Sequence, residues 1–508
     1  MTTEAWRRHL PEGTPPPTLD GDGATLATAW TARWRADPTA TALVELGKGS
    51  DPLTNTAAGL VRGSDPLTNA DLDVRSAAAA GLLARAGVRA GDRVLLSGAP
   101  TVAYLLLYVG AVRLGAVVVP ANTAYTAEEL AHLVADSGAT AAVVDDPARV
   151  ALPALVPAQA SFGGDAGGAV LDAAAPGDVA MIAYTSGTTG RPKGAMLTHR
   201  NLLASARAVV AAWRWTPADG LVLALPLFHL HGLGVGVHGS LVAGGRILLV
   251  GAFSPDAVAA AAAREDATML FGVPTMHKRL VEHPQAAAAL RSLRLVVSGS
   301  APLPDELWHR IHQVTGQRVL ERYGMTETVM NISNPYDGER RPGTVGLPLP
   351  GVEVRLAEDG EILLRGPNVF AGYHGRPDAT AEAFTDDGWF RTGDLGRVDA
   401  DGYYTIAGRS KELIITGGYN VYPREVEEVL ERHPGVDEAA VVGVPDDDWG
   451  ERVVAFVVAG TLDEPGLAAL VAQHLAPYKR PRAYHRVDAL PRNALGKVER
   501  ARLADRAA

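Results

Sequence analysis

The sequence predicts an α/β protein, with a large N-terminal domain of mixed and parallel sheets flanked by helices and a small α+β C-terminal domain. Three observations support this. Short runs of Val, Leu and Ile recur between longer Ala- and Leu-rich stretches. The 508 residues, 47% hydrophobic and 20% charged, have an ordinary globular composition and sufficient length for several domains. The composition also changes near residue 400.

The predicted strands of the large domain are continuous apolar runs rather than alternating ones, as expected for sheets covered on both faces. They span residues 93–98, 116–122, 141–146, 221–227, 246–253, 267–273 and 293–300. Helices are predicted over residues 126–137, 201–213 and 255–264. This alternation of strand and helix indicates a largely parallel arrangement.

The small domain is predicted from a second set of elements. These are a helix over residues 423–433, strands over 438–444 and 452–459, and a helix over 464–475. Residues 409–411 are polar and lack apolar periodicity. We therefore expect domains over residues 1–408 and 412–508, joined at 409–411.

A short internal duplication stands apart from these elements. The heptapeptide GSDPLTN occurs at residues 49–55 and again at 63–69. Its Gly, Pro and Asn content is typical of turns, and a single repeat of this length predicts a lengthened surface loop rather than a repeat protein. The second copy leads into a helix, because Thr68 and Asp71 have the spacing of a capping box.

The composition excludes several classes of function. Without cysteine, the chain has no disulfide, thiolate metal site or cysteine nucleophile, so any thiol chemistry uses a substrate thiol. The net charge of −10 argues against nucleic acid as a partner.

The most apolar stretch, 102–119, is interrupted by Arg113 and Gly115 and predicts a buried helix and strand rather than a membrane span. Residues 1–19 lack a signal-peptide core, so we expect a cytoplasmic protein; its oligomeric state is not predicted.

The strongest local motif is the segment YTSGTTGRPKG at residues 184–194. It follows a predicted strand at 179–183 and precedes a helix that begins near Thr198. Its glycines leave backbone N–H groups free to face a phosphate chain, its hydroxyls add neutral donors and Lys193 adds a positive charge. The spacing does not fit a Walker A loop. The segment therefore predicts a phosphate-binding loop of a different kind.

This segment resembles the phosphate loop of the acyl-adenylate-forming superfamily, which contains acyl-CoA synthetases, luciferases and nonribosomal adenylation domains. The resemblance continues in order along the chain. Its further motifs are RYGMTET at 322–328, FRTGD at 390–394, GRSKELIITGGYNVYP at 408–423 and PRNALGK at 491–497. It implies a two-step reaction, in which an acid and ATP form an acyl-adenylate and pyrophosphate, and a thiol, here that of coenzyme A, then attacks the adenylate.

The resemblance implies a nucleotide site. Tyr323 would stack on adenine, Asp394 and Arg409 would bind the ribose, and Glu327 would bind Mg²⁺, which with nucleotides takes few protein carboxylates. The implied ATP-binding residues are Thr185, Ser186, Gly187, Thr188, Thr189, Gly190, Lys193, Gly299, Ser300, Ala301, Glu321, Arg322, Tyr323, Gly324, Met325, Thr326, Asp394, Arg409 and Lys497.

The resemblance also implies catalytic and mobile parts. Lys497 would stabilise the charge that builds as the carboxylate attacks the α-phosphate. Lys193, His229 and Thr326 are the other implied catalytic residues. Ser410 would be the hinge about which the small domain turns. The glycines implied to approach the pantetheine arm of coenzyme A are Gly417 and Gly418.

The segments LPLFHLHGL, LFGVPTM, LVVSGSAPLP and ERYGMTET together resemble the malonyl-CoA synthetases of this superfamily. Arg279 follows a predicted buried strand, and a buried arginine is costly unless an anion pairs with it. By resemblance, Arg279 and Ser300 would hold a second, non-reacting carboxylate, and His229 and His231 would flank the reacting end. Met330 would also line this pocket. The expected substrate is therefore a small dicarboxylate, malonate or methylmalonate.

Several alternatives stay open at this point. Arg279 is also compatible with a surface ion pair on a helix, and His231 with a satisfied core histidine. The acid could instead be another short or aromatic acid, or an inorganic anion such as nitrite. The acceptor could be a carrier-protein thiol, and a nucleotide-binding regulatory protein without turnover is a further possibility.

Overall fold

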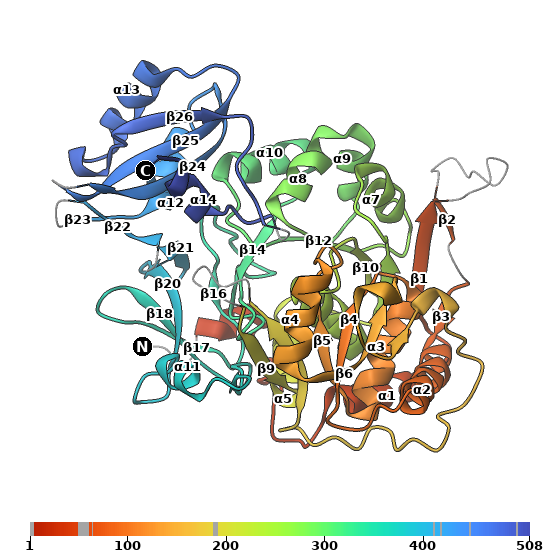
Figure 1. The fold of residues 1–508 in the computed structure, drawn as a ribbon. Coiled ribbons are helices and arrows are strands. Elements are labelled where there is room, and N and C mark those ends of the chain that lie inside the picture. Colours follow the sequence, from red (N-terminus) through yellow and green to blue (C-terminus); the bar gives the residue numbers. More distant parts are fainter. Residues whose placement is uncertain are drawn as a thin grey trace. The chain divides into compact units, whose positions relative to one another are not determined.

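The computed structural model describes residues 5–48, 60–62, 65–185, 192–409, 412–416, 419–446, 449–493 and 496–507. It is an α/β protein made of two compact units, shown in Figure 1. The large unit contains residues 1–354 and 364–390, and the small unit contains residues 355–363 and 391–508. The predicted fold class is confirmed. The predicted hinge stays a prediction, because Ser410 and Lys411 lie outside the described residues.

One sheet of the large unit has seven strands in the order β19-β9-β8-β5-β4-β6-β7. Its inner strands β8, β5, β4 and β6 are parallel. The bounds are β4 (Arg93–Ser97), β5 (Val117–Pro120), β6 (Ala139–Val144), β7 (Ala154–Leu155), β8 (Val179–Tyr184), β9 (Gly194–Thr198) and β19 (Gly372–Tyr373). The helices of this region are α2 (Asn69–Arg85), α3 (Val102–Leu114), α4 (Ala127–Ser137), α5 (His199–Ala212) and α11 (Pro377–Glu382), with 3₁₀ turns η3 (Pro147–Arg149) and η4 (Pro157–Gln159).

A second sheet has the order β16-β15-β14-β13-β12-β10-β11-β1-β2, and β3 pairs with β1. Its strands are β1 (Thr41–Lys48), β2 (Leu60–Arg62), β3 (Leu67–Thr68), β10 (Gly220–Leu223), β11 (Arg246–Leu249), β12 (Met269–Gly272), β13 (Leu295–Ser298), β14 (Leu320–Tyr323), β15 (Ile332–Ser333) and β16 (Leu347–Pro348). The accompanying helices are η1 (Ala5–His9), α1 (Leu26–Ala36), the π-helix η5 (His231–Val237), α6 (His238–Ala243), α7 (Pro255–Ala262), α8 (Pro274–Glu282), α9 (Pro284–Leu290) and α10 (Asp305–Thr315).

The predicted elements of the large unit are present, but each of the seven strands predicted there ends earlier than predicted. The last residues of β10, β11 and β13 are Leu223, Leu249 and Ser298. After two of these strands the backbone leaves the extended region, because Gly251 has a φ of 31° and Ser300 a φ of 69°. The residues that were assigned to strand ends therefore form loops at the edge of the sheet.

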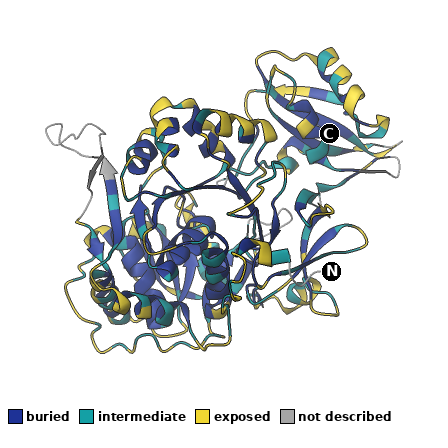
Figure 2. Cartoon of the chain, turned by 180° about the vertical axis from the view of Figure 1, so that it is seen from behind, coloured by how far each residue is buried: buried dark blue, intermediate teal, exposed yellow. Residues whose placement is uncertain are grey.

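The apolar stretch at 102–119 forms the buried helix α3 and then the buried strand β5, as predicted. Gly115 ends the helix with a φ of 78°. No helix within the described part of the chain combines the length and apolar character needed to cross a bilayer. Figure 2 shows how completely the strands of the large unit are buried, while its outer helices carry exposed faces.

The capping box predicted in the second GSDPLTN copy is confirmed at the start of α2. The Thr68 hydroxyl accepts a hydrogen bond from the backbone N–H of Asp71, and the Asp71 carboxylate accepts one from the N–H of Thr68. Leu67 and Thr68 also pair with β1. The first copy and residues 63–64 lie outside the described residues, so the loop prediction stays a prediction.

The small unit contains a five-stranded sheet in which β23-β22-β25-β24 are neighbours and β26 pairs with β25. A further sheet has the order β17-β18-β20-β21. Helices α12 and α13 bury Val426, Leu430, Leu467 and Val471 in one core. The strands are β17 (Glu353–Leu356), β18 (Glu361–Arg365), β20 (Phe390–Val398), β21 (Tyr404–Arg409), β22 (Ile414–Thr416), β23 (Tyr419–Val421), β24 (Val436–Asp446), β25 (Gly450–Ala459) and β26 (Ala483–Val487). The helices are α12 (Pro423–Leu430), α13 (Glu464–His474), η7 (Pro477–Lys479) and α14 (Arg500–Ala507).

Candidate active site

The parallel strands β12, β13 and β14 end side by side in the large unit. Gly272 pairs with Ser298, and Ser298 pairs with Glu321. Ligands of open α/β sheets bind outside the carboxyl ends of the strands. The segment from Gly299 to Ala301 follows β13, and the segment from Gly324 to Glu327 follows β14. The sheet therefore brings two of the predicted nucleotide segments to one edge.

The predicted phosphate loop connects β8 to β9. Tyr184 pairs with Gly194, and the N–H of Thr185 donates to the carbonyl of Lys193 at 3.0 Å, so both ends of the loop are fixed. The helix α5 begins after β9, and its N-cap is Thr198, as predicted. The strand β9 between loop and helix was not predicted. Ser186, Gly187, Thr188, Thr189 and Gly190 lie outside the described residues, so their phosphate contacts stay predictions.

Tyr373 connects the loop lysine to the predicted metal carboxylate. Its hydroxyl donates a hydrogen bond to Oε1 of Glu327 at 2.9 Å. Its ring centroid lies 5.1 Å from Nζ of Lys193. Burial, together with the negative charge of Glu327, raises the pKa of Tyr373, so its hydroxyl is a donor at neutral pH. Tyr373 reaches this position because β19 pairs with β9.

Glu327 is suited to the Mg²⁺ that the resemblance implies. It is a buried carboxylate, and no group of three or more acidic or histidine side chains that could hold a metal by themselves occurs in the described ranges. Magnesium that binds with a nucleotide takes one or two protein carboxylates and fills its other positions with phosphate and water. A single fixed carboxylate fits that requirement.

The turn after β14 is held by a buried amide. Nδ2 of Asn368 donates to the carbonyls of Thr328 and Met330 at 2.8 and 3.1 Å. Val329 has a φ of 58°, and an added Cβ at Gly324 would lie 2.1 Å from the carbonyl oxygen of Val329. This close turn places Thr326, half-buried, beside Glu327 and buries Met330. Tyr323, Gly324 and Met325 are also half-buried along it.

Asp394 and Arg409, both predicted to bind ribose, are paired in the small unit. They occupy the same register position of β20 and β21, and Nε of Arg409 donates to Oδ1 of Asp394 at 3.0 Å. The Asp394 side chain is 6% exposed and that of Arg409 is 40% exposed. The carboxylate is therefore fixed from within the unit, while the guanidinium reaches solvent.

Lys497 lies in a tight turn of the small unit. Its N–H donates to Oδ1 of Asn493 at 3.0 Å, and its carbonyl accepts from the N–H of Asn493 at 2.9 Å. Gly496 precedes it with a φ of 77°, a conformation that favours glycine. Arg492 donates to the Gly496 carbonyl and pairs with Glu438 at 2.9 Å. The backbone of Lys497 is fixed by these bonds, and the side chain is half-buried.

The structure brings together two of the predicted acid-binding residues, His231 and Ser300. The Ser300 hydroxyl lies 3.2 Å from Nδ1 of His231, and Nδ1 of His229 accepts from the N–H of His231 at 3.2 Å. Burial lowers the pKa of His231 well below its ordinary value, and the charge of Arg322 lowers it further. His231 is therefore neutral, and it begins the buried helix η5.

Two family models match the chain. The AMP-binding enzyme family matches residues 32–374, and the AMP-binding enzyme C-terminal domain matches residues 425–497. The chain belongs to the AMP-binding enzyme family. The resemblance to the acyl-adenylate-forming superfamily is confirmed, and so is the predicted enzyme class, an AMP-forming acyl-CoA synthetase.

Relatives of this AMP-binding enzyme act on different acids. A feruloyl-CoA synthase of Amycolatopsis sp. is 40% identical over 455 residues, which cover 84% of this chain and 91% of that protein. The ATP-bound MatB from Rhodopseudomonas palustris is 40% identical with a TM-score of 0.85, covering 94% of this chain and 98% of that one. A malonyl-CoA ligase with methylmalonyl-CoA and AMP bound is 45% identical with a TM-score of 0.62, covering 85% and 95%.

The expectation that Arg279 is buried is wrong. It lies exposed on α8, with its guanidinium 5.0 Å from the ring centroid of Phe253. The residues of α8 that face the core are Pro274, Met276, His277, Leu280 and Val281. Helical periodicity therefore directs Arg279, like Lys278, away from the core. Its predicted role in acid binding is not tested by this placement and stays a prediction.

A different arginine of the AMP-binding enzyme is buried. Arg322 on β14 is 6% exposed, and its Nε and Nη2 have no hydrogen-bond partner among the described residues. An added Cβ at Gly299 would lie 2.4 Å from Cζ of Arg322, so the guanidinium packs against the Gly299 backbone. Burial lowers the pKa of Arg322 to about 9, and the charge of Glu321 opposes that shift. The resemblance assigned Arg322 to the nucleotide site. Nothing in the sequence indicated that Nε and Nη2 of this buried side chain would have no hydrogen-bond partner among the described residues.

Three other features of the site follow from no local motif. Tyr373 and Asn368 carry no motif of their own and act through long-range pairing. Ser298 is buried with an unpartnered hydroxyl in the described structure. The two glycines predicted at the pantetheine arm, Gly417 and Gly418, lie outside the described residues, so that role also stays a prediction.

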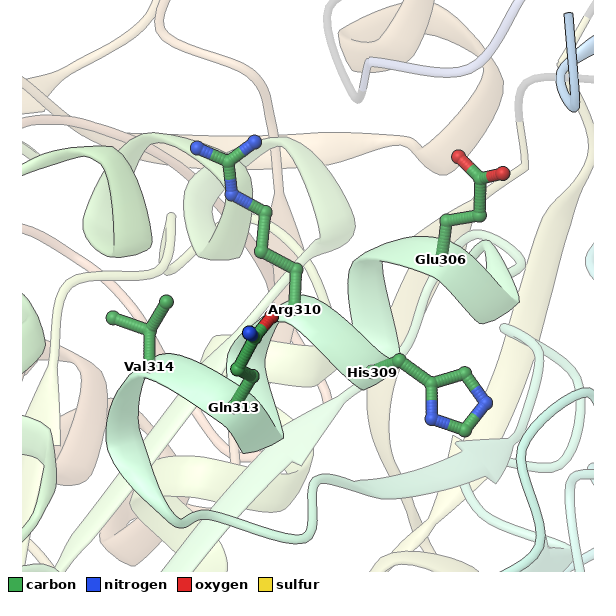
Figure 3. Close-up of a pocket in the computed structure, with 5 residues that line it drawn as sticks. All are labelled: Glu306, His309, Arg310, Gln313 and Val314. Atoms are coloured by element: carbon green, nitrogen blue, oxygen red, sulfur yellow. The ribbon is translucent and has the colours of Figure 1, made fainter. Parts of the chain in front are cut away.

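A surface hollow of about 650 Å³ lies elsewhere, along α10 (Figure 3). In the figure His309 and Arg310 point in different directions from the same helix. Its lining residues are Glu306, His309, Arg310, Gln313 and Val314. None of them is a predicted site residue, so this hollow is not the candidate active site.

Proposed function

We propose that this AMP-forming synthetase joins a small dicarboxylate, malonate or methylmalonate, to coenzyme A. The observation that carries the proposal is the cluster of buried His231, buried Arg322 and half-buried Ser300 at the carboxyl ends of β13 and β14. An acid with a second charged group suits such surroundings, because a buried cation needs an anion. The similarity to a malonyl-CoA ligase that holds methylmalonyl-CoA and AMP supports the same substrate class.

In the first step, a carboxylate oxygen of the acid attacks the α-phosphorus of ATP. A carboxylate–phosphorus bond forms, the bond to the β-phosphate oxygen breaks, and pyrophosphate leaves. Lys193 and Lys497 would stabilise the charge on the phosphate oxygens by electrostatic attraction. Mg²⁺ bound with the nucleotide would neutralise phosphate charge, and Glu327, fixed by Tyr373, would hold it.

In the second step, the thiolate of coenzyme A attacks the acyl carbon. A carbon–sulfur bond forms, the bond to the phosphate oxygen of AMP breaks, and AMP leaves. The chain has no cysteine, so the sulfur belongs to the co-substrate. Asp394 and Arg409 would retain the ribose during both steps. Turning of the small domain about Ser410, with Gly417 and Gly418 at the pantetheine arm, remains part of the proposal.

An aromatic acid is the second candidate substrate, because a feruloyl-CoA synthase is 40% identical over most of its length. A charged distal group distinguishes the two candidates. Ferulate has none, whereas malonate carries a second carboxylate. Nitrite and transfer to a carrier-protein thiol are further alternatives that the same assay can address.

Pyrophosphate release from the purified protein tests the proposal. The assay contains ATP and Mg²⁺ with malonate, methylmalonate, butyrate, ferulate or nitrite. Each acid or anion is tested with coenzyme A, with a holo-carrier protein or with neither, and mass spectrometry identifies the product. We expect the highest kcat/KM with malonate or methylmalonate and the corresponding CoA thioester. A higher kcat/KM with ferulate or butyrate would reject the dicarboxylate proposal. Product formation only with a holo-carrier protein would reject coenzyme A as the acceptor.

A further inference from the structure

The turn that carries Lys497 belongs to a short β-hairpin, the Lys497 hairpin, whose two sides are residues 491–493 and 497–499. The N–H of Glu499 donates to the carbonyl of Pro491 at 2.8 Å, and Arg492 pairs with Val498 as an antiparallel bridge. A two-stranded hairpin by itself is at best marginally stable in water. The position of Lys497 therefore depends on the contacts that fix this hairpin to the rest of the small unit.

Arg500, the first residue of α14, connects one side of the Lys497 hairpin to α12. Its Nη2 lies 2.8 Å from Oε1 of Glu427 and donates to Oε2 at 3.0 Å. The Glu427 side chain is 4% exposed, and its Oε1 also accepts from the N–H of Val441 on β24 at 2.8 Å. Arg424 lies farther from the same carboxylate, at 3.9 Å. Arg500 is therefore the nearer cation of a buried carboxylate, and a buried charge is costly to leave unpaired.

The Arg500 guanidinium also contacts the segment that follows the predicted hinge. Its Nε lies 3.3 Å from Oε2 of Glu412, which is two residues after Ser410. On the other side of the Lys497 hairpin, Arg492 pairs with Glu438 of β24 at 2.9 Å. Arginine side chains therefore anchor the hairpin on both sides, to α12 and residue 412 through Arg500 and to β24 through Arg492.

We propose that Arg500 is a positioning residue, which holds Lys497 in place for the first step of the reaction by anchoring the Lys497 hairpin to α12. The proposal rests on the catalytic role of Lys497 in the proposed function. The charge of Arg500 is compensated by Glu427 and Glu412, so its guanidinium is not available to neutralise a phosphate. Arg500 therefore affects the rate through the position of Lys497, and a displacement of about 1 Å can lower a rate about 100-fold.

A double-mutant cycle in the full-length protein tests this role. We measure the kcat of pyrophosphate release for the wild-type protein, Arg500→Met, Lys497→Ala and the double variant, with the acid that the wild-type protein uses best. We expect Arg500→Met to lower kcat roughly tenfold when Lys497 is present. When Lys497 is replaced by alanine, the change should be less than about twofold, because the group that Arg500 positions is then absent. Arg500→Lys, which keeps the charge, should recover part of the loss. Arg506→Met, at an exposed arginine on the same helix, is the matched control and should keep the wild-type kcat.

Hydrogen exchange provides a second readout that does not depend on turnover. The N–H groups of Asn493 and Glu499 are hydrogen-bonded within the Lys497 hairpin, so deuterium uptake by peptides that cover it reports how often the hairpin opens. We expect faster uptake in Arg500→Met than in the wild-type protein or Arg506→Met. If Arg500→Met does not fold, Arg500→Met combined with Glu427→Gln replaces it in each comparison, because that variant leaves no unpaired buried carboxylate.

Two results would overturn the proposal. One is an equal loss of kcat from Arg500→Met with and without Lys497, which would show that Arg500 acts on the fold in general. The other is unchanged deuterium uptake by the Lys497 hairpin in Arg500→Met. Failure of the proposed function has a different signature, because Lys497→Ala would then keep the wild-type kcat. Faster uptake in Arg500→Met would in that case still support the anchoring of the hairpin by Arg500.

Discussion

Tyr373 shows how one side chain can connect two motifs that are far apart in the sequence. Its hydroxyl holds Glu327 and its ring lies beside Lys193, although 46 and 180 residues separate it from them in the chain. A residue that hydrogen-bonds to a metal ligand, and so orients it, commonly has a strong effect on metal affinity. The site therefore depends on long-range side-chain contacts that no sequence motif indicates.

Tyr373→Phe removes the hydroxyl and keeps the ring. We expect the concentration of Mg²⁺ needed for half-maximal rate to rise roughly tenfold, because Glu327 loses the bond that orients it. Calorimetric binding of ATP at several Mg²⁺ concentrations provides a second readout that does not depend on turnover. Tyr125→Phe, at a half-buried tyrosine on another part of the surface, is the control. Unchanged Mg²⁺ dependence in Tyr373→Phe would show that Glu327 needs no such support.

The residues that could be predicted from the sequence are those fixed by local chemistry. A helix was expected to begin near Thr198, and Thr68 was expected to cap α2 because a capping box involves only four consecutive residues. By resemblance, Ser300 was expected at the non-reacting end of the acid and His231 at its reacting end, whereas the Ser300 hydroxyl lies 3.2 Å from Nδ1 of His231. The burial of Arg279 was predicted wrongly. It was inferred from the buried strand that precedes α8, and not from the helical periodicity of α8 itself.

At the scale of elements, η5 and α6 form one buried helical segment that contains four of the large unit's glycines and two neutral histidines. His238 on α6 lies against α3, where its Nε2 is 2.5 Å from the hydroxyl of Tyr108. Its ring also lies 5.5 Å from that of Trp30 on α1.

The alternation of strand and helix was predictable from the sequence. The strands β9 and β19 were not, because their pairing with each other joins residues almost 180 positions apart.

The buried histidines His238 and His277 predict that acid destabilises the large unit. Burial lowers the pKa of His238 to about 3 and that of His277 to about 4, below the unfolded value of about 6.5. The unfolded chain therefore binds more protons at pH 5, and stability is lost as the pH falls through 6.5 toward these values. We expect the free energy of unfolding to decrease by roughly 1 kcal/mol per histidine for each pH unit in this range.

Urea unfolding followed by tryptophan fluorescence at pH 7 and pH 5 measures this effect. In His238→Gln, which cannot be protonated, the decrease between the two pH values should be smaller than in the wild-type protein. His309→Gln alters an exposed histidine on α10 and should preserve the wild-type decrease. An equal decrease in His238→Gln and the wild-type protein would show that His238 does not contribute.

At the scale of the whole molecule, the small unit is assembled from two separate parts of the chain. Residues 355–363 belong to it together with residues 391–508. Glu361 pairs with Arg391 at 3.1 Å and accepts from the N–H of Gly393 at 2.9 Å, and Thr392 donates to the carbonyl of Ile362 at 2.7 Å. The sequence placed the boundary only at 409–411, because nothing in a local pattern shows that an earlier segment returns to the later unit.

This arrangement predicts that residues 391–508 alone are incomplete. A fragment that begins at residue 350 retains Glu361 and Ile362, whereas a fragment that begins at 391 loses the partners of Arg391, Thr392 and Gly393. We expect the shorter fragment to unfold at a lower urea concentration, measured by circular dichroism. A longer fragment with Glu361→Ala should fall between them, since it loses side-chain bonds and keeps the strand. Equal midpoints for the two fragments would contradict the prediction.

The contact between Gly299 and Arg322 limits the order in which these positions can change. A methyl group at 299 would come within 2.4 Å of the guanidinium carbon, so a larger residue there requires the Arg322 side chain to move. A larger residue at 299 is therefore tolerated more easily once residue 322 has been shortened, because the shorter side chain leaves that volume free. In the reverse order, the buried guanidinium has to move before the new side chain at 299 can be accommodated.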